Sequence, residues 1–275
     1  MYRGYQLNLT REFEIFHKEG LSQYRDVKSK AQIFLDTYTL RDGTLDGTQM
    51  QGDWFPLIDA DVFISHSHKN EDAAIELSGW LSKTFGLTSF IDSCVWGYGD
   101  DLLREIDKEH CKIEDSIYSY KKRNQSTSHV HMMLCTALSK MIDKAKCVFF
   151  LNTPDSISTI KAINNAGDDT ATPSPWIYYE IAVTELIRKK IPKGYKPRVN
   201  ESTMIEAQLD VLYRADLSHL YKLDKKKLIE WRDGFKKKEE AHPIADKLAH
   251  YLEGNPHPLS AKALCLLYDM TPLTA

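Results

Sequence analysis

The pattern of apolar and polar positions over residues 61–91 predicts a strand, a helix and a second strand, in that order. Residues 61–65 form a short, β-rich apolar run, which is typical of a buried strand. Asn70 can cap a following helix, and Gly86 stands where the C-terminal cap of that helix belongs. The core positions of the helix are Ala74, Leu77, Leu81 and Phe85. Residues 87–91 predict a second strand, so the segment is a βαβ unit and the sheet is expected to be parallel.

Later segments continue this α/β pattern. Residues 146–152 are the most apolar predicted strand, and Ser174 followed by Pro175 is a strong helix start. The polar stretch 154–173 predicts a loop. The other expected elements are a helix over 132–142, a helix from 175 to about 190, a strand over 209–213, and helices around 228–235 and 243–253.

Three segments lie outside this core pattern. Residues 1–57 predict a helical N-terminal extension, and residues 216–275 a helical C-terminal one, which leaves a main domain over 58–215. The first extension has a stripe at steps of three and four: Tyr24, Val27, Ala31, Phe34 and Tyr38. A helix packed on the main domain is favoured over a dimerising arm. Residues 93–130 mix aromatic, charged and polar positions and predict an insertion.

Composition narrows the classes of protein that remain. Hydrophobic residues make up 42% of the chain, enough to form a core. The 36 Lys and Arg against 39 Asp and Glu leave a net charge of −3, which argues against nucleic acid as a partner. The apolar run 147–151 is far shorter than the ~20 residues of a membrane-spanning helix. No secretory signal is visible, and five cysteines without Cys-x-x-Cys spacing fit a reducing compartment. We therefore expect a soluble, cytoplasmic protein.

One carboxylate falls on an apolar helix face. Glu180 follows Trp176 by four residues and shares its side of the helix with Val183 and Ile187. A carboxylate in such a position is costly unless it is paired or lines a cleft. Spacing alone leaves both interpretations open: a structural ion pair or helix-end contact, and a functional group near the carboxyl ends of the strands.

Two His-x-His pairs and a glycine-containing turn are weaker candidates for chemistry. His66 with His68, and His129 with His131, invite a zinc hypothesis, but no acidic or cysteine residue follows at a recognised ligand spacing. Residues 96–100 lack the spacing of either a dinucleotide or a P-loop motif. We expect no metal site and no such nucleotide loop.

Taken in order, four segments resemble a TIR (Toll/interleukin-1 receptor) domain. They are the first strand and its loop at 61–66, the second strand at 89–92, the helix-to-strand passage at 141–151, and the Trp-x-x-x-Glu helix at 174–180. The resemblance covers roughly 58–215 and implies a flavodoxin-like parallel sheet of about five strands with helices on both faces. The added segments are similar to those of prokaryotic TIR proteins of anti-phage systems such as Thoeris.

The resemblance implies cleavage of NAD+ at the nicotinamide–ribose bond. In this family the glutamate of the Trp-x-x-x-Glu helix is catalytic, and the matching residue here is Glu180. NAD+ would be the substrate, so no separate cofactor is expected. The residues that the resemblance assigns to substrate binding are His66, Ser67, His68, Asp92, Trp96 and Trp176.

The same resemblance implies partners. TIR proteins assemble through TIR–TIR contacts, and a product derived from ADP-ribose would act on a separate effector protein if the enzyme signals instead of depleting NAD+. Two alternatives remain: a non-enzymatic TIR scaffold, and a metal-dependent hydrolase that uses the His-x-His pairs.

Overall fold

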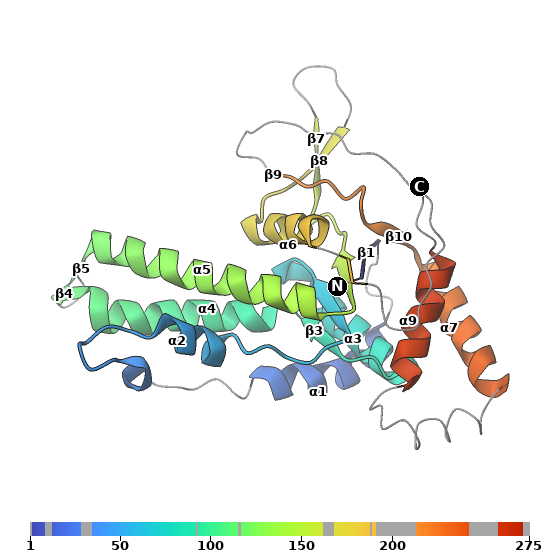
Figure 1. Ribbon diagram of the computed structural model, residues 1–275. Helices are drawn as coiled ribbons and strands as arrows, with labels where there is room; N and C mark the ends of the chain where they lie inside the picture. The colour runs from blue at the N-terminus through green and yellow to red at the C-terminus, as the bar shows by residue number, and fades with distance from the viewer. Residues whose placement is uncertain are drawn as a thin grey trace.

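The structure is a computed structural model, and the part of the chain that it describes has several gaps (Figure 1). The described residues are 2–8, 13–28, 35–91, 93–114, 117–161, 168–187, 189–190, 213–241 and 258–271. Among them, no helix is both long and apolar enough to cross a membrane.

A five-stranded parallel sheet forms the centre of the protein. Its order is β10 (Tyr221–Leu223), β1 (Arg3–Leu7), β6 (Cys147–Leu151), β2 (Val62–Ser65) and β3 (Ser89–Ile91). All four neighbouring pairs are parallel. The predicted α/β class and the parallel sheet of about five strands are therefore confirmed.

The predicted βαβ unit is present. Helix α3 (Glu71–Phe85) joins β2 to β3, and the two strands pair directly, with Phe63 opposite Phe90. Gly86 ends the helix in the left-handed region, at φ 66°, which a residue without a side chain adopts at no steric cost. Its N–H donates to the carbonyl of Ser82 at 2.9 Å.

Helices cover both faces of the sheet, as expected. Successive strand residues point to opposite faces, so Val62 and Ile64 join one apolar cluster while Phe63 joins the other. The first face is covered by α1 (His17–Lys28), α3, α7 (Lys225–Ala241) and α9 (Pro258–Met270). The second is covered by α2 (Gly47–Trp54), α4 (Ser93–Ile106), α5 (Tyr120–Lys144) and α6 (Pro175–Leu186).

The two ends of the chain differ from the expected helical extensions, because each supplies a strand to the central sheet. β1, from the segment 1–57, lies between β6 and β10, and β10 comes from the segment 216–275. Arg3 is 1% exposed, and its guanidinium donates to the carbonyls of Tyr268, at 2.6 Å, and Thr271 at the end of α9. The negative end of the helix dipole compensates this buried charge.

The first extension also departs from the expected single stripe. Helix α1 ends at Lys28, and Tyr38 belongs to a separate 3₁₀ turn (Leu35–Tyr38), where it is buried beside Met50 and Trp54. Ala31 and Phe34 lie outside the described residues.

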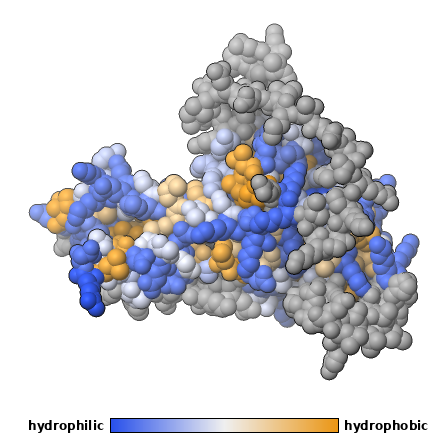
Figure 2. All heavy atoms as spheres, in the orientation of Figure 1, coloured by the Kyte–Doolittle hydropathy of each residue, from blue (hydrophilic) through white to orange (hydrophobic). Residues whose placement is uncertain are grey.

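The expected insertion at 93–130 is a helical hairpin. Helix α4 runs through a π-helical turn (Asp107–Cys111) into two short antiparallel strands, β4 (Lys112–Glu114) and β5 (Ile117–Tyr118), and α5 returns. The predicted helix at 132–142 therefore begins at Tyr120, where Ser119 caps it. The hairpin projects from the sheet, and apolar side chains gather at its far end (Figures 1 and 2).

The predicted polar loop at 154–173 contains two strands. β7 (Ser158–Lys161) pairs with β8 (Asp168–Thr172), which pairs with β9 (Tyr213–Arg214), in a separate antiparallel sheet. Most of the strand predicted at 209–213, and the whole helix predicted at 243–253, lie outside the described residues.

Candidate functional site

A pocket of about 300 Å³ opens at the carboxyl ends of three neighbouring strands. Its lining residues are His66, Ser67, His68, Lys69, Ser93, Asp155, Ser174, Trp176 and Ile177. The first four follow β2, Ser93 follows β3, Asp155 follows β6, and the last three form the start of α6. Ligands of open α/β sheets bind at this edge, because the loops after parallel strands converge there.

The start of α6 forms one wall of the pocket. Ser174 caps the helix by accepting the N–H of Ile177 at 3.3 Å, and Pro175 occupies the first helical turn, as predicted. The ring of Trp176 meets His131 of α5 edge to face, with the centroids 5.3 Å apart. The helix ends at Leu186, a turn earlier than expected.

Removal of this cap gives a testable effect. We expect Ser174→Ala to lower the free energy of unfolding by about 1 kcal/mol, because the N–H of Ile177 loses its acceptor. Urea denaturation measures the change. Asp46 caps α2 by accepting from Thr48 and Gln49. Asp46→Ala is the matched control: it should cost similar stability, while only Ser174→Ala should weaken ligand binding in the pocket.

Glu180 is buried near the pocket and is not one of its lining residues. Its side chain is 1% exposed, and Oε2 accepts a hydrogen bond of 2.6 Å from the hydroxyl of Ser65. Ser65 is the last residue of β2 and precedes the lining residue His66, while Ile177, three residues before Glu180, also lines the pocket. The carboxylate is therefore held at the carboxyl end of β2, next to the pocket.

The structure brings together four of the predicted binding residues. His66, Ser67, His68 and Trp176 all line the pocket, although His66 is only 3% exposed. Asp92 lies outside the described residues. The backbone of Trp96 lies in α4, and the structure does not describe the side chain of this residue.

Three residues that matter to the site were not predicted: Ser65, Lys69 and Asp155. The sequence signal that could have identified them is their position at or just after the end of a strand. Ser65 is the one polar residue that closes the apolar run of β2, and Lys69 and Asp155 follow strand ends that meet at one edge of the sheet. Their pairing across loops far apart in sequence could not be read from spacing.

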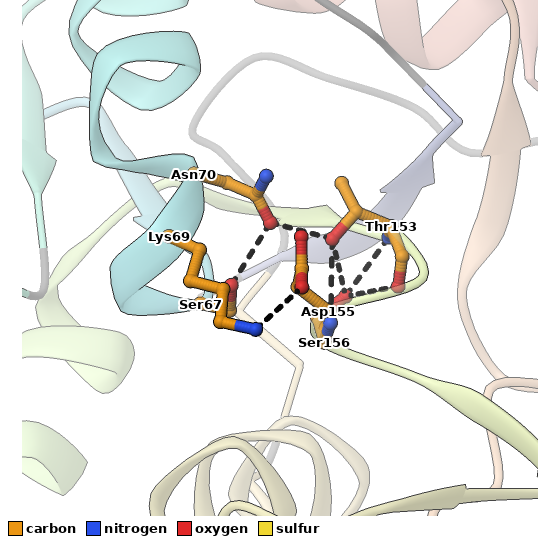
Figure 3. A network of polar contacts seen from close by, with 6 residues as sticks. All are labelled: Ser67, Lys69, Asn70, Thr153, Asp155 and Ser156. Carbon is orange, nitrogen blue, oxygen red and sulfur yellow. Dashed lines mark hydrogen bonds and ion pairs between the residues drawn. The ribbon is translucent and has the colours of Figure 1, made fainter.

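A polar network, the loop clamp (Ser67, Asn70, Thr153 and Ser156), joins the loops after β2 and β6 (Figure 3). Oδ1 of Asn70 accepts from the hydroxyls of Ser67, at 2.9 Å, and Thr153, at 2.6 Å. The hydroxyl of Ser156 accepts the N–H of Thr153 at 2.9 Å and donates to the carbonyl of Leu151 at 2.8 Å. The clamp therefore fixes the spacing of two loops that line the pocket.

A contact with His219 holds the far end of α6. Burial lowers the pKa of His219, and the negative charges of Glu185 and Asp216 oppose this only in part. Nε2 of His219 lies 2.8 Å from the hydroxyl of Thr184, which itself donates to the carbonyl of Ile181. The contact with His219 and the Ser174 cap together position α6 near both of its ends.

The two His-x-His pairs lie on different elements. His66 and His68 follow β2 and line the pocket, while His129 and His131 belong to α5. Within the described ranges, no three His, Cys, Asp or Glu side chains come close enough together to hold a metal ion.

Comparison of the chain with protein families, with curated proteins and with solved structures gave no significant match.

Proposed function

We propose that this protein is a TIR-type enzyme that cleaves NAD+ at the nicotinamide–ribose bond, with Glu180 as its catalytic carboxylate. The observation that carries the proposal is the contact between Ser65 and Glu180, which holds a buried carboxylate at the carboxyl end of β2, beside the pocket. The resemblance of the Trp176-x-x-x-Glu180 helix to that of catalytic TIR domains supports the same role.

The chemistry needs little more than one carboxylate. Nicotinamide leaves NAD+ as a neutral molecule from a cationic ring, so its departure requires no general acid. The ribose then develops oxocarbenium character, as in other glycosyl transfers. A preorganised negative charge beside the ribose stabilises that charge, and the hydrogen bond from Ser65 holds the carboxylate of Glu180 in one orientation.

The size of the pocket limits which part of the dinucleotide it holds. At about 300 Å³ it lies at the lower end of ligand sites, which span ~300–1,000 Å³, and so suits the nicotinamide riboside end. Because Glu180 is 1% exposed and does not line the pocket, the ribose reaches its carboxylate only when the pocket opens further. We expect TIR–TIR self-assembly to supply that movement.

The biological role we infer is anti-phage defence of the Thoeris type. The enzyme would either deplete NAD+ or make an ADP-ribose-derived signal that a separate effector protein senses. Capture of the ribosyl cation by water gives ADP-ribose, and capture by the adenine ring gives a cyclic product, so exclusion of water decides between them.

The test is direct incubation of concentrated, crowded protein with NAD+, with products resolved by mass spectrometry. Release of nicotinamide is the expected result, and the mass of the co-product separates hydrolysis from cyclisation. If the assembled protein leaves NAD+ unchanged, the proposal fails.

A non-enzymatic scaffold is the second candidate. It is favoured by the exposed apolar side chains at the end of the α4–α5 hairpin, where Ile113 is 64% and Ile117 52% exposed. Such residues mark interaction surfaces when they gather (Figure 2). Assembled protein that is active in cells without consuming NAD+ would support this function.

A further inference from the structure

An ion pair lies at the pocket, between the same two loops that the loop clamp joins. Nζ of Lys69 donates to Oδ1 of Asp155 at 3.1 Å, and both residues line the pocket (Figure 3). The side chain of Lys69 is 80% exposed and that of Asp155 38%. Neighbours of both belong to the loop clamp: Asn70 follows Lys69, and Ser156 follows Asp155.

Once Asp155 is set aside, the charged and polar groups around the pocket favour an anion. Asp155 supplies the single carboxylate among the nine lining residues, whereas Lys69 offers an ammonium group and His68 a ring N–H. The N-terminus of α6 adds the positive end of a helix dipole, because Ser174, Trp176 and Ile177 belong to the same lining. An acidic side chain therefore sits where the surrounding groups would accept a ligand's negative charge.

We propose that Asp155 holds, with its own carboxylate, the position on Lys69 that a substrate phosphate takes on binding. The inference rests on the proposed function and assigns a phosphate position within it: Lys69 and Asp155 distinguish nucleotides that carry a phosphate or pyrophosphate, as NAD+ does, from neutral nucleosides. Asp155 is then a specificity residue, which withdraws from Lys69 only when a stronger anion arrives.

The exposure of the pair makes this exchange easy. An ion pair between exposed side chains contributes little to stability, so little is lost when Lys69 releases Asp155. A phosphate offers more charge and more acceptor oxygens than a carboxylate, and lysine binds it as a point charge. The loop clamp keeps the two loops in place during the exchange, because its hydrogen bonds do not involve Lys69 or Asp155.

Ligand titrations of the full chain test the exchange without depending on catalysis. Inorganic pyrophosphate, ADP-ribose and adenosine are titrated by calorimetry into the wild type, Lys69→Met and Asp155→Asn. We expect Lys69→Met to weaken binding of pyrophosphate and ADP-ribose about five- to tenfold, and Asp155→Asn to strengthen it about three- to fivefold. Adenosine should bind all three proteins equally. In the Lys69→Met background, Asp155→Asn should have a smaller effect.

Asp101→Asn is the matched control. Asp101 also pairs with an exposed cation, Arg104, at 2.8 Å, but it lies on α4 and does not line the pocket. It should leave every affinity unchanged. The proposal is overturned if pyrophosphate does not bind the wild type, if Lys69→Met leaves pyrophosphate binding unchanged, or if Asp155→Asn weakens it.

These titrations also separate the inference from the proposed function. Pyrophosphate binding that depends on Lys69 and Asp155, in a protein that never releases nicotinamide, would support the phosphate position and refute NAD+ cleavage. Nicotinamide release that is equal in the wild type and Lys69→Met at low NAD+ concentration would support cleavage and overturn the phosphate position.

Discussion

Glu180→Gln is expected to lower the rate of nicotinamide release by about 10²–10³-fold, the usual cost of losing one preorganised electrostatic contact to a transition state. Glutamine keeps the length of the side chain, and its amide oxygen can still accept the hydrogen bond that Ser65 donates at 2.6 Å. The change therefore removes the negative charge with little change in packing. Release is measured by mass spectrometry on assembled protein, beside a thermal melt that checks folding.

Glu76→Gln is the control for this experiment. Glu76 is also a helical glutamate that is 1% exposed, but it lies on α3 and does not line the pocket. A loss of buried charge alone would affect both variants, whereas a catalytic role affects only Glu180. Full activity in Glu180→Gln would remove Glu180 from the mechanism, and equal losses in both variants would point to stability instead of chemistry.

Gly79→Ala is expected to lower the free energy of unfolding by about 3 kcal/mol or more, although it adds only one methyl group. Helices α1 and α3 approach closely at this glycine. A methyl group on Gly79 would lie 2.0 Å from the carbonyl oxygen of Phe16 and 2.7 Å from the backbone nitrogen of Gly20. Backbone atoms cannot rotate away as a side chain can, so the two helices must separate. Urea denaturation measures the loss.

Gly52→Ala is expected to change the free energy of unfolding in the opposite direction in the same assay. Gly52 also lies within a helix, α2, but nothing lies within 4 Å of the position that its methyl group would take. Alanine should therefore stabilise the protein by about 0.5–1 kcal/mol, through its higher helix propensity. Similar effects at both positions would mean that the approach of α1 to α3 is looser than the structure places it.

The sequence predicts the elements whose signal is local. The strands β2, β3 and β6 are apolar on both faces, and the caps Gly86 and Ser174 mark helix ends, so each could be identified from neighbouring residues. β1 could not, because its Arg3 and Gln6 are polar and become buried only through contacts with distant segments.

The sequence predicts residues 93–130 only as an insertion, because the contacts that make this segment a helical hairpin also leave no local pattern. The first turns of α5 are polar. A buried carboxylate in the π-helical turn that follows α4, instead of an apolar stripe, holds them in place. Asp107 accepts from Ser126 at 2.6 Å and from Arg123 at 2.8 Å. Burial alone would raise the pKa of Asp107, but hydrogen bonds from Ser126, Cys111 and Arg123 lower it. Such a network has no periodic signature.

The sequence predicts those residues of the candidate site that directly follow a strand. His66, Ser67 and His68 follow a strand that the sequence identifies, and loops after parallel strands converge at one edge. The partners of charged groups were not predictable in this way. Ser65 meets Glu180 and Lys69 meets Asp155 across separations of 115 and 86 residues, which depend on the finished topology of the sheet.

The position of β1 has a consequence for the order of events during synthesis. Tyr5 pairs with Phe149 on one side and with Tyr221 on the other, and Arg3 bonds to Thr271, 268 residues away. A ribosome adding about 5–20 residues per second leaves β1 without its second neighbour for roughly 10–40 s. Contacts of such high contact order form slowly, so the nascent chain exposes an unpaired edge to chaperones meanwhile. β1 leaves the ribosome well before its partners, yet it sits in the interior of the sheet that they complete.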